Sequence, residues 1–185
     1  MKSVLISIKP KWCEKIAAGE KTIEVRKNAP KPPFKVYIYE TKDTKGVHGL
    51  SVLGRYRLGK VVGEFICDKV YEYKFHEGLT EFNSMGLPWR TYGAYLIFTD
   101  DYKSMCLSYD EVKKYGKGNT LYGWYISDLK IYDEPKELSE FKGLCRVKVD
   151  CHNCPHYNYS KMDCDSRAIS RAPQSYMFVE EIETR

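Results

Sequence analysis

"SIKPKWCEKIAAGEKTIEVRK", residues 7 to 27, combines three structural signals in one short stretch. Pro10 suits the first turn of a helix, because the amide at that position has no hydrogen bond to lose. Gly19 suits the end of that helix, because glycine adopts the left-handed conformation without a steric penalty. The residues that follow, KTIEVRK, alternate between polar and apolar side chains, which is typical of a strand with two unlike faces. We therefore expect a helix that ends at Gly19 and a strand after it.

Polar side chains gather on one face of this predicted strand. Thr22, Glu24 and Arg26 point one way, while Ile23 and Val25 point the other. One interpretation is a solvated ion pair on an exposed sheet face, which contributes little to stability. The other interpretation is a groove between this face and the preceding helix.

A groove of this kind would collect positive charge. Lys9 ends the first predicted strand and Lys21 begins the second, so both are expected to point into the groove with Arg26. Arginine clamps a phosphate or a base edge with its planar fork, and lysine acts as a point charge. Glu24 would accept a hydrogen bond from the amino group of a base, or would orient Arg26. Trp12 on the helix is either a plate on which a base stacks or a core anchor.

Alternating patterns elsewhere predict further strands, around residues 3–8, 35–41, 60–75, 120–133, 144–149 and 176–182. The run at 60–75 exceeds an ordinary strand, so we expect a bend near Gly63 or Asp68. Ser108 and Glu111 form a capping box, which predicts a short helix over 108–116. Residues 77–104 favour neither helix nor strand. The whole pattern indicates an α+β fold, a small and partly open β-barrel with a few short flanking helices.

Composition narrows the class of protein. The chain has 185 residues, 43% of them hydrophobic, which is enough for one core. Its formal charge of +5 permits a polyanionic partner without requiring one. No apolar run reaches the length of a membrane span, and the first apolar stretch is interrupted at Lys9 and Pro10, so we expect no membrane partner and a cytoplasmic location. The seven cysteines, an odd number, then argue against a disulfide scaffold.

Three pieces of the chain together resemble a known family. They are residues 7–27, quoted above, "GKVVGEFICDKV" at 59–70, and "LYGWYISDLKIY" at 121–132. In this order they resemble the ASCH domain, a branch of the PUA-like β-barrel superfamily. The resemblance extends over residues 3 to 133.

The resemblance implies a barrel with a cleft beside the first helix, lined by the charged face of KTIEVR. It implies binding of RNA, a nucleotide or a modified base, with Lys9, Trp12, Lys21, Glu24 and Arg26 as the binding residues. It also offers an alternative, because some small members are amidohydrolases that deacylate acetylcytidine. In that case Lys21 would be the catalytic lysine. The threonine nucleophile of those enzymes falls at Glu24 here, and the nearest hydroxyl is that of Thr22.

A cysteine-rich segment follows the part that resembles the family. Four soft ligands with a CxxC spacing fit a tetrahedral structural zinc site, made by Cys151, Cys154 and Cys164 with either His156 or Cys145 as the fourth. The segment is polar and loop-like, so a metal would stabilise a piece too small for its own core. A redox-active CxxC is the alternative.

These observations predict two parts, the barrel over residues 1–143 and a cysteine-rich segment with a closing strand over 144–185. The function expected first is binding of RNA, a nucleotide or a modified base in the charged cleft. The alternatives are the amidohydrolase, and a protein-interaction module with a structural zinc.

Overall fold

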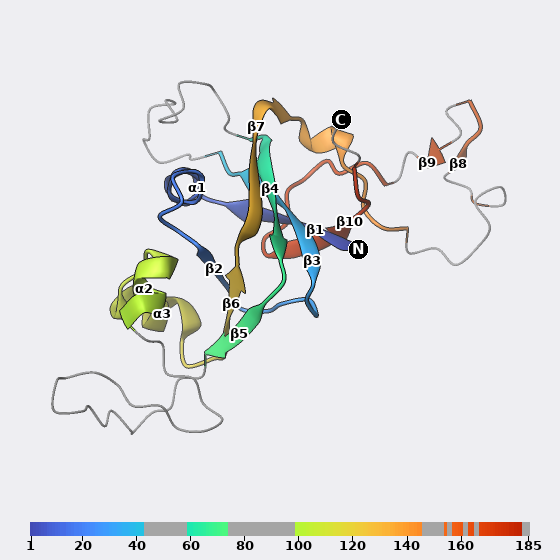
Figure 1. Ribbon diagram of the computed structural model, residues 1–185. Coiled ribbons are helices and arrows are strands. Elements are labelled where there is room, and N and C mark those ends of the chain that lie inside the picture. The colour runs from blue at the N-terminus through green and yellow to red at the C-terminus, as the bar shows by residue number, and fades with distance from the viewer. Residues whose placement is uncertain are drawn as a thin grey trace, which may run out of the picture. The chain divides into compact units, whose positions relative to one another are not determined.

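The computed structural model describes residues 1–42, 59–73, 99–145, 154, 157–160, 163–164 and 167–182 (Figure 1). The chain divides into two compact units. Unit 1 comprises Met1–Pro10, Lys35–Glu64 and Lys130–Arg185, and unit 2 comprises Lys11–Phe34 and Phe65–Leu129.

A five-stranded sheet contains β1 (Lys2–Ile8), β3 (Phe34–Glu40), β4 (Val61–Cys67), β7 (Ser127–Lys136) and β10 (Tyr176–Val179). Its strand order is β10-β1-β3-β4-β7. The strongly apolar sequences of β1 and β3 explain why their side chains are buried on both faces. Most of this sheet belongs to unit 1, although β3, β4 and β7 also contribute residues to unit 2.

The core of unit 1 is formed by side chains of this sheet and of the C-terminal segment. Its buried members are Leu5, Tyr37, Tyr39, Val61, Tyr132, Phe141, Ile169 and Val179. A polar network adjoins it, in which the Glu64 carboxylate accepts a hydrogen bond of 2.5 Å from the Tyr132 hydroxyl and lies 3.1 Å from the Lys35 ammonium. Burial works to lower the pKa of Lys35, but its hydrogen bond to Glu64 and the electrostatic effects of Tyr37, Glu64 and Glu181 together outweigh burial, and the pKa is raised. The network therefore keeps charged groups compatible with a largely buried position.

Unit 2 contains a three-stranded antiparallel sheet of order β2-β6-β5, made by β2 (Ile23–Arg26), β6 (Leu121–Tyr125) and β5 (Val70–Tyr73). Three short helices accompany it, α1 (Pro10–Ala17), α2 (Thr99–Met105) and α3 (Tyr109–Gly116). One face of the sheet forms the core of this unit with α2 and α3, through Ile23, Val25, Tyr73, Met105, Val112 and Leu121. The other face carries Glu24 and Arg26, as the alternation of the sequence predicts.

Neither α2 nor α3 ends with a glycine in the left-handed conformation, the residue that most often ends a helix. α2 ends with Cys106 in the left-handed region at φ 53°, and the amides of Cys106 and Leu107 bond to the carbonyls of Lys103 and Tyr102. This pair of bonds is a Schellman motif without its usual glycine. α3 has the predicted capping box of Ser108 with Glu111, and Lys117 takes the left-handed position after Gly116.

The C-terminal part of the chain contains small elements only. A 3₁₀ turn spans Leu138–Glu140, and a two-stranded hairpin pairs β8 (Tyr157–Asn158) with β9 (Asp163–Cys164). Among the described helices, none combines the length and the apolar character needed to cross a membrane.

The α+β class is confirmed, and most predicted elements are present with shorter bounds. The run at 60–75 divides into β4 and β5 at Asp68, and the run at 120–133 divides into β6 and β7 at Ile126. α2 was not predicted. The expected partly open barrel is not shown, because the sheets of the described residues run from edge to edge without closing. The undecided stretch up to residue 98 and the strand expected at 144–149 lie largely outside the described residues, and the division at residue 143 stays a prediction.

Gly63 on β4 tests how closely this sheet packs. A Cβ added there would lie 2.6 Å from the carbonyl oxygen of Lys130 on β7, a backbone atom that moves only with its strand. We expect Gly63→Ala to lower the free energy of unfolding by about 1–3 kcal/mol, as overpacking does. Gly143→Ala is the control, because its Cβ would meet its nearest neighbours at 3.8 Å. Urea unfolding of both variants checks this, and equal stabilities would contradict it.

Candidate functional site

Among the described residues of unit 2, Lys21 is the most deeply buried charged side chain, with 2% of its surface exposed. The chain turns after α1 at Gly19, φ 74°, and the amides of Glu20 and Lys21 both bond to the carbonyl of Lys15. This tight turn aims Lys21 inward. Its ammonium group donates to the carbonyl of Ile23 at 2.8 Å and to that of Met105 at 2.7 Å.

Glu24 connects Lys21 to Arg26. One carboxylate oxygen of Glu24 lies 3.4 Å from the Lys21 ammonium, and the other lies 3.0 Å from Nη2 of Arg26. Glu24 and Arg26 are each 7% exposed. Two buried cations therefore share one carboxylate, and the trio retains an excess of positive charge. The interpretation as a solvated ion pair on an exposed face is wrong.

The geometry also limits what Lys21 does chemically. An ammonium group has three protons, and Lys21 has three partners in Ile23, Met105 and Glu24. Thr22 is exposed, and its backbone is held by Ser104 and Ile126. In this arrangement the ammonium is committed to structural contacts, and the hydrolase role of Lys21 and Thr22 stays a prediction.

The remaining predicted binding residues occupy different surroundings. Trp12 is partly buried on α1, and the ammonium groups of Lys11 and Lys21 lie 4.1 Å and 5.3 Å from its ring centroid. Its ring is thus already in contact with cations, which accounts for it without a stacked base. Lys9 is exposed and belongs to unit 1, whereas Lys21, Glu24 and Arg26 belong to unit 2.

A hollow of about 610 Å³ opens in unit 2 beside the end of β2. It is lined by Lys27, Asn28, Ala29, Pro30, Lys31, Pro32, Val70, Glu72 and Tyr122. The loop after β2 supplies six of these residues, two of which are prolines that favour an extended backbone. The sequence reading did not identify the hollow, because Val70, Glu72 and Tyr122 come from strands far along the chain.

The pairing register of the three strands determines which side chains line this hollow. Arg26 is paired with Tyr122, and Tyr122 is paired with Glu72, so the three side chains form one row on one face of the sheet. Glu24 lies two residues before Arg26 and therefore on the same face. The buried Glu24–Arg26 pair thus adjoins the row that lines the hollow.

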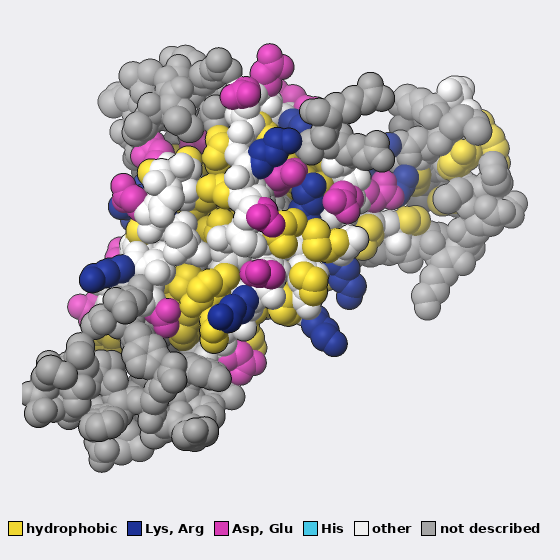
Figure 2. Space-filling model, viewed as in Figure 1, with side chains coloured by type: hydrophobic (Ala, Val, Ile, Leu, Met, Phe, Trp, Pro, Cys, Tyr) yellow, Lys and Arg dark blue, Asp and Glu magenta, His cyan; other side chains and the backbone are white. Residues whose placement is uncertain are grey.

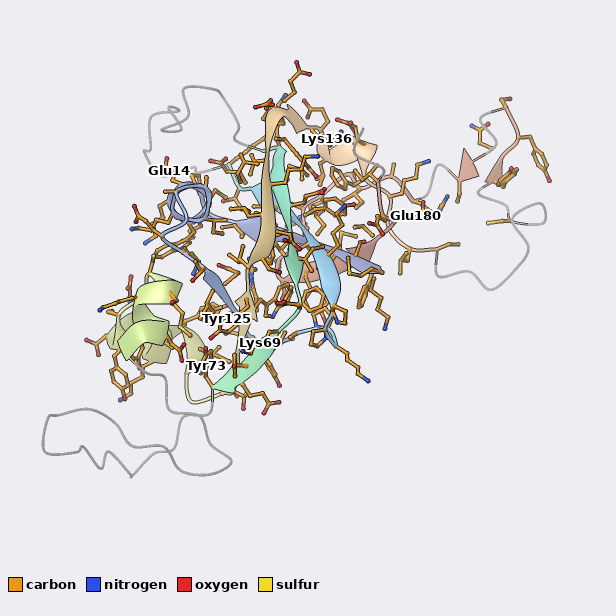
Figure 3. All side chains as sticks on the ribbon, viewed as in Figure 1. Glu14, Lys69, Tyr73, Tyr125, Lys136 and Glu180 are labelled. Atoms are coloured by element: carbon orange, nitrogen blue, oxygen red, sulfur yellow. The ribbon has the colours of Figure 1, made fainter. Side chains whose placement is uncertain are left out.

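The opposite face of β5 and β6 carries a second polar cluster, where Lys69, Tyr73 and Tyr125 lie close together in Figure 3. The rings of Tyr71 and Tyr125 are 5.1 Å apart, and the Lys69 ammonium lies 4.8 Å and 5.4 Å from their centroids. Burial, with the negative charge of Asp101 nearby, raises the pKa of Tyr125 to about 12. The phenol is therefore neutral at physiological pH, and this cluster holds β5 to β6.

Surface charge alone does not locate a ligand. On the face shown in Figure 2, Lys and Arg side chains alternate with Asp and Glu side chains over the described residues. The shape and chemistry of the hollow are therefore better guides than net charge.

The predicted metal ligands lie only partly within the described residues. Cys145 is exposed, Cys154 is intermediate and Cys164 is buried, while Cys151 and His156 lie outside the described part of the chain. Among described residues, no three His, Cys, Asp or Glu side chains are grouped to hold a metal ion.

The family model of the ASCH domain matches residues 6–141, well over half of the chain. The chain belongs to the ASCH domain family. ASCH domains are PUA-like, and they are generally associated with RNA binding or with hydrolase-like activity. No curated protein matches the chain.

Solved structures agree with the family. The ASCH protein from Zymomonas mobilis has a TM-score of 0.54 and 16% identity, over 97% of this chain and 89% of that chain. A serine-to-alanine variant of it has a TM-score of 0.57 and 15% identity, over 97% of this chain and 89% of that one. A tyrosine-to-phenylalanine variant gives 0.54 and 16%, over 98% and 92%. At these identities the likeness establishes the fold alone.

Lys21→Met tests whether the buried trio holds this ASCH domain together. Methionine matches the lysine side chain as far as Cε but lacks the ammonium, so Glu24 and two carbonyls are left without their donor. Removing one partner of a buried ion pair costs about 3–5 kcal/mol, so we expect a loss of that order in urea unfolding. Lys15→Met is the control, because its ion pair with Glu20 is solvent-exposed. Equal stability of the two variants would contradict the assigned role.

The zinc site also remains a prediction, and two observations bear on it. The Tyr157 amide donates to the Cys154 carbonyl at 3.0 Å, and Tyr157 pairs with Cys164. A hairpin with only two residue pairs has little stability by itself, so a bound metal ion would be needed to hold it together. We expect about one zinc ion per chain by elemental analysis. Cys154→Ser and Cys164→Ser should lose it, and Cys106→Ser in unit 2 should retain it. A metal-free wild-type protein would rule the site out.

Proposed function

We propose that this ASCH-domain protein binds RNA or a nucleotide, and that the hollow of unit 2 takes one nucleotide unit. The observation that carries the proposal is the composition of the hollow. Two exposed lysines, Lys27 and Lys31, share it with the partly buried ring of Tyr122. Single-stranded nucleic acid is bound by this combination of positive charge along the backbone and aromatic rings for the bases.

The two lysines account for the phosphate. Lys27 and Lys31 outnumber Glu72, the acidic residue among the lining side chains. The Lys21–Glu24–Arg26 trio adds its excess positive charge from beneath the same face. Buried charges are screened by salt less than exposed ones, so this contribution persists at physiological ionic strength.

Tyr122 accounts for the base. Its position is set on both sides, by pairing with Arg26 on β2 and with Glu72 on β5. A ring on a central strand is pre-organised, so little side-chain entropy is lost when a base stacks on it. Glu72 lies directly opposite and offers a carboxylate to an exocyclic amino group.

The buried trio has an indirect part in this proposal. Lys21, Glu24 and Arg26 are occupied with one another and with backbone carbonyls. They hold β2 in place, and β2 leads into the loop that forms most of the hollow. Direct contact of these residues with a ligand, which the sequence led us to expect, is not needed.

The amidohydrolase alternative requires a different state of the site. Lys21 would have to lose a proton and release one of its three acceptors before its nitrogen could take a proton from Thr22 or from water. No described contact favours that state, so we do not propose the activity.

Fluorescence anisotropy of a labelled ten-residue oligouridine tests the proposal in the full chain. We expect Tyr122→Ala to weaken binding by about 5- to 150-fold, the value of one stacked base. Tyr122→Phe keeps the ring and should bind as the wild type does. Lys31→Ala should reduce the slope of log K against log salt by about 0.7, the contribution of one phosphate contact to a single strand.

Lys103→Ala is the matched control, because Lys103 is an exposed lysine of the same unit that does not line the hollow. It should change neither affinity nor slope beyond the error of the titration. Wild-type protein that binds no oligouridine at low salt, or a Tyr122→Ala variant with unchanged affinity, would refute the proposal.

A further inference from the structure

Tyr115 is an exposed aromatic residue next to the proposed site. It lies on α3, and 41% of its surface is exposed. Large aromatic side chains are costly to leave in water unless a partner covers them. Its ring has a cationic neighbour, because the Lys27 ammonium lies 5.2 Å from the ring centroid.

Lys27 connects the hollow to the surroundings of Tyr115. It lines the hollow that contains Tyr122, and its ammonium lies beside the ring of Tyr115. Lys27 follows Arg26 directly in the chain, so the end of β2 sets its position. Lys27 therefore lies beside the ring of Tyr115 and also lines the hollow that contains the ring of Tyr122.

The charges that act on Tyr115 also place its ring near the end of β2. Partial burial raises the pKa of the Tyr115 phenol, and the positive charge of Arg26 opposes this rise. The phenol is therefore uncharged at neutral pH and does not repel a phosphate. On the same helix, Lys113 and Lys114 are exposed and add positive charge around the ring.

We propose that the ligand is a strand of RNA at least two nucleotides long, with one base on Tyr122 in the hollow, the next on Tyr115, and the phosphate between them on Lys27. This rests on the proposed function and makes it more specific, because a free base or a mononucleotide fills only the hollow. Stacking on Tyr115 tolerates any base, since every base offers a π face.

Competition between two small RNA ligands tests this inference. Uridine 5′-monophosphate and the dinucleotide UpU each carry one phosphate group. The monoester has a charge of about −1.5 to −2 at neutral pH and the diester has one negative charge, so charge alone favours the monophosphate and an advantage of UpU must come from its second nucleoside. Each is titrated against the full chain bound to labelled oligouridine. One stacked base corresponds to about 5- to 150-fold in affinity, so UpU should compete at a concentration about tenfold or more below that of the monophosphate. Tyr115→Ala should abolish this advantage and leave the monophosphate unchanged.

Tyr109→Ala is the matched control on the same helix. Tyr109 is 47% exposed, and its cationic neighbour is Lys113 at 5.9 Å instead of Lys27. It should keep the full advantage of UpU. An advantage that persists in Tyr115→Ala, or that Tyr109→Ala removes equally, overturns the inference while the hollow remains a nucleotide site. Failure of both ligands to compete overturns the proposed function together with it.

Discussion

The hydrogen bonds of one ammonium group organise unit 2. Taking a lysine out of water costs several kcal/mol unless its protons find acceptors. Lys21 finds them in the carbonyl of Ile23 on β2, the carbonyl of Met105 at the end of α2, and the carboxylate of Glu24. The last carbonyls of a helix have no partner within it, so Lys21 also caps α2. The start of the charged strand and the end of an unpredicted helix are thus fixed by the same group.

This constraint reaches the proposed ligand site through β2. Glu24 is held by Lys21 and in turn holds Arg26, which sets the side chains of β2 on a buried face. The chain leaves β2 at Arg26 and enters the loop that provides Lys27 and Lys31. A site built on a rigid strand end loses less entropy on binding than one built on a free loop. The buried charges therefore act on binding by positioning exposed ones.

Local sequence signals predicted most of the helices and strands, whereas contacts between distant residues determined which side chains are buried. Alternation along KTIEVRK correctly placed Glu24 and Arg26 on one face, and Ser108 with Glu111 correctly predicted α3. The sequence could not show that this face is covered, because Met105 lies 84 positions from Lys21. α2 escaped prediction because Cys106 occupies the left-handed position that glycine usually marks. Tyr122 was recognised only as part of a strand, since its pairing with Arg26 depends on register across the sheet.

A division between buried and exposed charge also supports the proposal that an ASCH domain with a modest net charge binds a single strand. A large basic field would attract any polyanion, whereas exposed charges of both signs alternate over the face in Figure 2. Attraction is then concentrated where the buried excess charge of Lys21 and Arg26 lies under the exposed lysines of one loop. Two aromatic rings belong to the proposed site, that of Tyr122 in the hollow and that of Tyr115 beside Lys27. A chain that alternates phosphate and base could use a lysine and both rings together, whereas a free nucleoside or a simple anion could use only one of them, so the proposed site favours an oligonucleotide.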